Sequence, residues 1–195
     1  MKEDPEKQLI KRAKNGDRTA FDLLVRSCAK KVYNNVLRLC GSPQMAEDIL
    51  QDGFVKAYKN IKGFKEESAF ASWVSRIAIN CWKNRVRYEK RRKFFSHFSL
   101  GAGKEDEDER EIQVASEAPG PDRDLERKLK KEKVQNALNS INDQAREMIV
   151  LRDIEELSYE EIANMLGISM GTVKSRIARA RSRLKEKLKK DFGDD

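Results

Sequence analysis

Apolar residues recur at intervals of three and four positions over most of this chain, which is the spacing of one face of an α-helix. Runs that alternate apolar and polar residues are scarce, so the sequence predicts no sheet. Glycine, proline or capping residues interrupt the helical pattern. In the N-terminal half these breaks predict four helices that end near Asn15, Cys40, Ile61 and Phe94, with Ser68 as the cap of the fourth.

A second block of helices is predicted from about Leu125 onwards, and one of them spans residues 144–154. Two more follow at the end of the chain. Ser158 and Glu161 form an S-x-x-E capping box, which marks the start of the first of these. Gly167 follows its last apolar residue, where a positive φ would end the helix.

The last predicted helix combines an apolar stripe with a strongly basic remainder. Ser169 can cap it, and the stripe consists of Val173, Ile177, Ala180 and Leu184. Residues 172–190 contain nine Lys or Arg and one acid, a local charge of +8. A merely solvated helix usually mixes the two signs, so this alternative is the weaker one. The pair of helices is typical of a helix-turn-helix whose second helix enters the major groove of DNA.

The fourth predicted helix carries another basic surface. Residues 83–93 include seven basic side chains and one acid. Lysine and arginine neutralise phosphates, and the interleaved Asn80 and Asn84 matter more because amides can read base edges. The pattern indicates a second contact with DNA.

Aromatic residues surround the loop that precedes this helix, in the stretch FKEESAFASW. Phe64, Phe70 and Trp73, together with small polar side chains, could hold an unstacked base. The alternative, which we favour for Phe70 and Trp73, is that these rings simply belong to the core.

The third predicted helix, AEDILQDGFVKAYKNI, has the opposite character. Its inward face is formed by Ile49, Phe54, Ala57, Tyr58 and Ile61. Its outer face is mostly acidic and is formed by Glu47, Asp48, Gln51, Asp52 and Lys56. An acidic face does not bind DNA, but it suits a protein partner with a basic surface. The alternative is a face that is only solvated.

Composition narrows the possible functions. The chain has 195 residues, 38% of them charged, and a net charge of +8, which favours a polyanionic partner. No apolar run approaches the roughly 20 residues that span a bilayer, and the N-terminus is too polar for a signal peptide, so a cytoplasmic protein without membrane insertion is expected. Cys28, Cys40 and Cys81 are interpreted as buried thiols, and with His97 as the sole histidine no metal or other cofactor is expected.

The predicted fold class is all-α, with two small helical domains joined by a flexible linker. Residues 1–95 form the first domain and residues 125–195, which include the helix-turn-helix, form the second. Residues 96–124 are rich in glycine, proline and acids, and are interpreted as a flexible acidic linker. An enzyme acting on nucleic acid would need clustered carboxylates in a folded domain, and only this linker offers a cluster. The sequence therefore predicts a protein that is not an enzyme.

Three motifs in this order resemble a bacterial alternative sigma factor of the extracytoplasmic-function (group IV) type in the sigma-70 family. They are AEDILQDGFVKAYKNIKGF, SAFASWVSRIAINCWKNRVR and LRDIEELSYEEIANMLGISMGTVKSRIARAR. The resemblance covers nearly the whole chain except the linker. It implies that the first domain is sigma region 2, which binds the −10 promoter element, and that the second is region 4, which binds the −35 element.

The resemblance also implies roles for individual residues. Docking on the β′ clamp helices of core RNA polymerase would involve Asp48, Gln51, Asp52, Val55 and Lys56. Opening of the −10 element and capture of the melted non-template strand would involve Phe64, Ser68, Phe70, Ser72, Trp73, Arg76, Asn80, Lys83, Asn84 and Arg87. Binding of the −35 duplex would involve Ser169, Thr172, Lys174, Ser175, Arg176, Ala178, Arg179, Arg181 and Arg183. Among the last set, Thr172, Arg176 and Arg181 would hold phosphates.

Further partners follow from the same resemblance. The second domain would also bind the β-flap of polymerase, and an anti-sigma factor would hold the free protein. Two alternatives stay open at this point. A stand-alone helix-turn-helix regulator would use the C-terminal half alone and would bind duplex DNA without polymerase. An enzyme that processes nucleic acid is the other.

Overall fold

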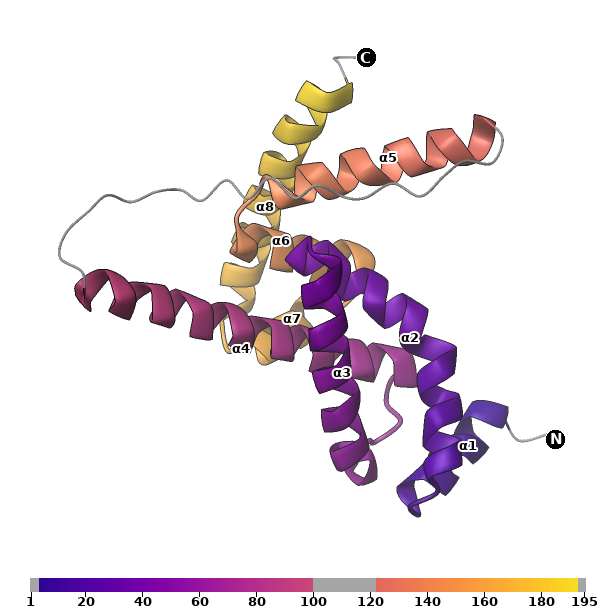
Figure 1. Cartoon of the computed structure of the whole chain (residues 1–195). Helices are drawn as coiled ribbons and strands as arrows, with labels where there is room; N and C mark the ends of the chain where they lie inside the picture. Colours follow the sequence, from indigo (N-terminus) through magenta and orange to yellow (C-terminus); the bar gives the residue numbers. More distant parts are fainter. Residues whose placement is uncertain (1–3, 100–121, 193–195) are drawn as a thin grey trace. The chain divides into compact units, whose positions relative to one another are not determined.

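The computed structural model describes residues 4–99 and 122–192, and every regular element in those ranges is helical (Figure 1). The predicted all-α class is confirmed for that part of the chain. The chain divides into two compact units, which we call the N-terminal unit and the C-terminal unit.

The N-terminal unit is built on α1 (Pro5–Lys14), α2 (Arg18–Cys40) as far as Val36, α3 (Pro43–Asn60) and α4 (Phe70–Ser99), with a 3₁₀ turn, η1 (Ile61–Gly63), after α3. The predicted ends of the first three helices are confirmed to within a residue or two. Local signals account for this agreement, since proline begins α1 and α3 and a side-chain oxygen caps each of them.

The core of the N-terminal unit is drawn from all four helices. Its buried residues include Ile10, Leu24, Val32, Val36, Ile49, Ala57, Phe70, Val74, Ala78 and Ile79. Helix α3 packs along α4, and Gly53 faces Ala78 across this contact. A Cβ atom at Gly53 would lie 3.2 Å from the Cβ of Ala78, so a larger side chain would push the helices apart.

The C-terminal unit is built on α5 (Asp122–Asn139), α6 (Asp143–Ile149), α7 (Tyr159–Leu166) and α8 (Met170–Phe192), and α6 continues into a turn of π-helix, η2 (Val150–Ile154). Helix α8 packs on α5, α6 and α7. Its predicted apolar stripe forms much of the core, because Val173, Ile177 and Ala180 are all at most 2% exposed.

The helix-turn-helix has the predicted caps. The Ser158 hydroxyl accepts from the Glu161 amide at 3.1 Å, and the Glu161 carboxylate accepts from the Ser158 amide at 2.9 Å. Gly167 ends α7 with a φ of 65°. The Ser169 hydroxyl accepts from the amide of Thr172 at 3.2 Å and so caps α8. These contacts span three or four residues, which is why the sequence predicted them.

Arg146 on α6 is a buried arginine that links α6 to the end of α5 through hydrogen bonds. Its side chain is only 8% exposed, and burial lowers its pKa, although a guanidinium stays charged at neutral pH. It donates to the carbonyls of Leu138, Asn139 and Ile141 at 2.8, 3.0 and 3.1 Å. The guanidinium thus satisfies carbonyls that the end of α5 leaves without a helical partner.

The predicted linker, residues 96–124, lies largely outside the described residues. Helix α4 continues to Ser99 and α5 begins at Asp122, so each helix extends a few residues into that range. Two of the three thiols are buried as predicted, but Cys40 is partly exposed. Burial raises the pKa of Cys28 to about 11.

Candidate nucleic-acid interface

Helix α3 presents its predicted outer face to solvent. Ala46, Ile49, Gly53 and Ala57 are buried at intervals of three and four residues, which turns the acidic side chains outward. The exposed residues of this face are Glu47, Asp48, Gln51, Asp52, Val55 and Lys56. Val55 lies among these polar residues with 54% of its surface exposed. The acidic outer face therefore also has an apolar contact point.

The loop between η1 and α4 rests on an aromatic cluster. The ring of Phe64 lies 4.8 Å from that of Trp73 and 5.9 Å from that of Phe70. Phe64 and Phe70 are only 3% and 1% exposed, whereas Trp73 is partly exposed. Burial of Phe70 confirms the favoured interpretation that its ring belongs to the core. In this conformation the rings of Phe64 and Phe70 support the loop from below and are not exposed to a base.

The remaining residues predicted at this loop and on α4 reach the surface. Asn80, Asn84 and Arg87 are exposed, at successive steps of four and three residues that keep them on one side of the helix. Partly exposed positions are Ser68, Ser72, Arg76 and Lys83. The amides and the cations thus form the stripe that the sequence predicted on α4.

The first turn of α4 has a cap that the sequence did not reveal. The helix begins at Phe70, and its amide donates to the carboxylate of Glu6 on α1 at 3.3 Å. Ser68, the predicted cap, precedes the helix by two residues. The two partners are 64 residues apart, so no local pattern indicates this contact.

Helix α8 divides its polar side chains between two flanks. Lys174, Ser175, Ala178 and Arg179 are exposed. On one flank, Arg176, Arg179 and Arg183 line a hollow of about 50 Å³ together with Asn142 and Gln144 at the start of α6. Several guanidinium groups beside polar groups suit a phosphate, and Arg179 belongs to this group as well as to the predicted base-reading set.

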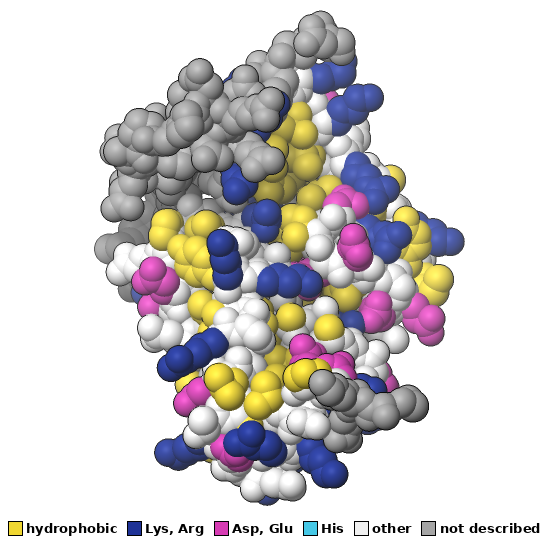
Figure 2. Space-filling model, turned by 90° about the vertical axis from the view of Figure 1, so that its right-hand side faces the viewer, with side chains coloured by type: hydrophobic (Ala, Val, Ile, Leu, Met, Phe, Trp, Pro, Cys, Tyr) yellow, Lys and Arg dark blue, Asp and Glu magenta, His cyan; other side chains and the backbone are white. Residues whose placement is uncertain are grey.

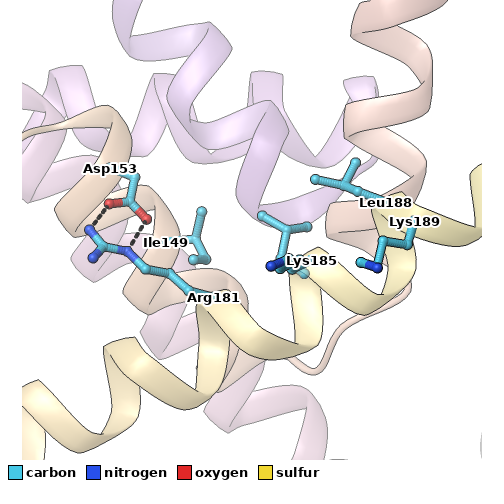
Figure 3. A pocket seen from close by; sticks show the side chains of 7 residues that line it. Ile149, Asp153, Arg181, Lys185, Leu188 and Lys189 are labelled. Atoms are coloured by element: carbon cyan, nitrogen blue, oxygen red, sulfur yellow. Dashed lines mark hydrogen bonds and ion pairs between the residues drawn. The ribbon is translucent and has the colours of Figure 1, made fainter. Parts of the chain in front are cut away.

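On the other flank Arg181 is engaged within the protein (Figure 3). Its guanidinium forms an ion pair with Asp153 of η2, and the hydrogen bonds to that carboxylate are the first cause of its raised pKa. Arg181 was predicted to hold a phosphate. In this structure two of its donor atoms, Nε and one terminal nitrogen, engage Asp153 instead, while the side chain stays 52% exposed.

Beyond this ion pair, an open groove of about 370 Å³ runs between α6, η2 and the second half of α8. Ile149, Leu184 and Leu188 provide its apolar surface, and Lys185 and Lys189 stand at its edge (Figure 3). This groove was not predicted, because its walls come from helices far apart in the sequence.

On the face drawn in Figure 2, Lys and Arg side chains lie among acidic and apolar ones. The described residues hold no group of three His, Cys, Asp or Glu placed to bind a metal ion. Within the same ranges, no helix is long and apolar enough to cross a membrane.

Comparisons with known proteins identify the family. Residues 24–92 match the family model of sigma-70 region 2, and residues 131–184 match that of sigma-70 region 4. The RNA polymerase sigma-H factor of Pseudomonas aeruginosa is 32% identical over 188 residues, which is 96% of both chains. The ECF RNA polymerase sigma factor SigW of Bacillus subtilis is 34% identical over 183 residues, covering 94% of this chain and 96% of SigW.

This chain belongs to the extracytoplasmic-function sigma factors of the sigma-70 family. It is an alternative sigma factor that directs promoter recognition and transcription initiation, as the resemblance implied. Among solved structures, the sigma factor RpoE of Bartonella quintana matches with a TM-score of 0.60 and 27% identity, covering 87% of this chain and 96% of RpoE. CnrH matches with the same TM-score at 23% identity, which supports the fold alone.

Proposed function

We propose that this sigma factor divides its work among three surfaces: the acidic outer face of α3, the loop and amide stripe of α4, and the basic helix α8. The observation that carries the proposal is the separation of charge, since one exposed acidic helix face accompanies two exposed basic ones. An acidic face repels DNA and attracts a basic protein surface. The basic helices suit the phosphate backbone.

The acidic face of α3 would dock on the β′ clamp helices of core RNA polymerase. Exposed Asp48 and Asp52 would set the orientation, and Val55 would provide the apolar contact. In the C-terminal unit, the groove lined by Ile149 and Leu184 would receive the β-flap. Its apolar floor and lysine edge support this assignment, because an amphipathic segment could bury its apolar side there.

Helix α4 and the loop before it would open the −10 element, and residues 1–95 would form this module. Asn80 and Asn84 would contact bases, and Arg76, Lys83 and Arg87 would hold the backbone. Partly exposed Trp73, with Ser68 and Ser72, would border the site of an unstacked non-template base. Base capture would offset the free energy of unstacking, which is a few kcal/mol per flipped base.

Helix α8 would read the −35 element, and residues 125–195 would form this second module. Lys174, Ser175 and Ala178 would face the bases, while Arg176 and Arg183 would hold phosphates in the hollow beside α6. Ser169 and Thr172 would contact the backbone at the helix start. Neither module needs high affinity alone, because attachment to one polymerase raises the effective concentration of the second contact.

The proposed function also implies partner proteins and a cytoplasmic place of action. No residue is assigned covalent chemistry, so the chain would not be an enzyme and polymerase would supply the catalysis. It would act in the cytoplasm, where polymerase and promoter DNA meet. RpoE of Bartonella quintana was solved with the anti-sigma factor NepR, and by this likeness an anti-sigma factor would hold our protein as well.

Run-off transcription with core RNA polymerase on a library of genomic fragments tests the proposal. Specific transcripts that require the added chain would support it, and their aligned start sites would reveal both promoter elements. Failure to associate with core polymerase, together with tight binding to duplex DNA alone, would favour a stand-alone regulator instead.

Asn80→Ala is expected to slow the opening of a duplex promoter by about tenfold or more, because a well-placed amide contact contributes about 1–3 kcal/mol. Binding to core polymerase should change by less than about twofold, since Asn80 is exposed on a different helix from the docking face. Fluorescence of a base analogue in the −10 element measures opening, and anisotropy measures core binding. Equal loss in both assays would contradict the assigned role.

Arg179→Ala separates two roles that the structure brings together in one hollow. If Arg179 reads a base, the variant should lose about tenfold affinity for the correct −35 sequence and little for altered ones. Arg183→Ala is the matched control, and it should weaken all sequences alike and reduce the salt dependence by about one phosphate contact. A uniform loss in Arg179→Ala would place it with the phosphate contacts.

A further inference from the structure

Helix α1 contacts both ends of the loop that is proposed to capture a base. At the start of the loop, Lys14 pairs with the carboxylate of Glu66, and its Nζ lies 5.7 Å from the ring centroid of Phe64. At the end of the loop, Glu6 accepts from the amide of Phe70 at 3.3 Å. The partners are 52 and 64 residues apart, so the contacts depend on tertiary structure.

The backbone at Glu66 shows that the loop is held in an unfavourable conformation. Its φ is 62°, in the left-handed region that a residue with a Cβ atom seldom adopts. Glycine would adopt this conformation at lower cost. The side chains of Lys14 and Glu66 are 25% and 37% exposed. An ion pair so close to solvent stabilises the fold by no more free energy than a positive φ at a residue with a Cβ atom costs. The pair therefore fixes a conformation more than it adds stability.

Attachment of α1 to the core does not require these contacts. Ile10 and Ala13 on the same helix are 3% and 1% exposed and anchor it by packing. The ring of Phe64 lies between Lys14 and Trp73, because it contacts the Lys14 ammonium group on one side and packs against the Trp73 ring. A shift of Lys14 can therefore be passed through Phe64 to the partly exposed ring of Trp73. A change at Lys14 should thus disturb the loop while α1 remains docked.

We infer that α1 is a positioning element of the promoter-opening loop, with Lys14 and Glu6 as the positioning residues. The match to sigma-70 region 2 begins at residue 24, so α1 lies outside it. Lys14 holds Glu66 in its left-handed conformation above Phe64, and Glu6 fixes the start of α4. The loop is then preformed when a base unstacks, which lowers the cost of ordering it during opening. This inference rests on the proposed function of the loop.

Charge reversal tests the pair. Lys14→Glu and Glu66→Lys should each slow opening of the duplex promoter by about threefold to tenfold, and the double swap should restore it to within about twofold. Matched controls reverse an exposed charge outside the loop, Lys11→Glu on α1 and Asp22→Lys on α2, and should open the promoter at the unaltered rate. Core binding and melting temperature should stay the same throughout.

Glu66→Gly distinguishes a positioning role of the pair from a purely structural one, because the two roles predict different combinations of melting temperature and opening rate. Glycine relieves the strain of the positive φ, so the melting temperature should stay or rise while opening still slows. Opening at the unaltered rate in Lys14→Glu, no rescue by the double swap, or loss of folding in either single variant would overturn the inference. Asn80→Ala is the reference: if it slows opening and Lys14→Glu does not, the inference fails while the proposed function stands.

Discussion

Replacing Asp48 and Asp52 by lysine is expected to weaken binding to core RNA polymerase about a hundredfold, through the loss of two attractions and the gain of two repulsions. Both side chains are exposed on the outer face of α3, opposite the buried Ile49 and Gly53, so the fold should persist. Anisotropy of the labelled protein with core polymerase measures the change. Transcription from the mapped promoters should fall in parallel.

The matched control carries the same change of charge elsewhere in the N-terminal unit. Asp22→Lys combined with Glu67→Lys alters two exposed carboxylates, on α2 and in the loop, and should leave core affinity within about twofold of the original. Binding of the unaltered protein should weaken with salt, because the contact is electrostatic. Retention of tight binding by the Asp48 and Asp52 variant would remove α3 from the docking surface.

Replacing Arg146 by methionine is expected to destabilise the C-terminal unit by about 3–5 kcal/mol. Methionine has a comparable length but no donors, so the carbonyls of Leu138, Asn139 and Ile141 lose their partner. A unit of this size is stabilised by only about 4–10 kcal/mol in total. Much of the helix-turn-helix should therefore unfold at physiological temperature.

The two tryptophans of the chain allow unfolding of the N-terminal unit to be followed separately from unfolding of the C-terminal unit. Trp73 and Trp82 both lie on α4, so tryptophan fluorescence reports the N-terminal unit, whereas circular dichroism reports both units. Arg146→Met should lower the dichroism transition and leave the fluorescence transition in place. Arg183→Met, at an exposed arginine of α8, is the control and should change neither. A shared shift of both transitions would mean that the two units unfold together.

Several features could be predicted because their signals are local. The capping box of Ser158 and Glu161, the positive φ of Gly167 and the cap at Ser169 each involve residues within a single helical turn. The inward stripe of α8 follows from the period of the helix. In the same way, the exposed acidic side of α3 followed from the buried residues at intervals of three and four.

Contacts between distant residues could not be predicted. Asp153 engages Arg181 across 28 residues, and no local pattern in the sequence indicates this ion pair. Burial of Phe64 depended on its packing against Phe70 and Trp73 of α4 and under Lys14 of α1. The cap of α4 came from Glu6, although Ser68 stood at a plausible position in the sequence.

The sequence by itself determined the helices, their caps, the helix-turn-helix, the signs of charge on each helix and the family. These properties depend on the order of residues within a turn or two, and on motifs that extend over most of the chain. Only the tertiary structure decided which side chains remain available to a partner. Arg146, Arg181 and Lys14 have similar charges, but one supports buried carbonyls, one binds Asp153 and one holds the loop through Glu66. Their partners come from other parts of the chain, and packing alone brings them within reach.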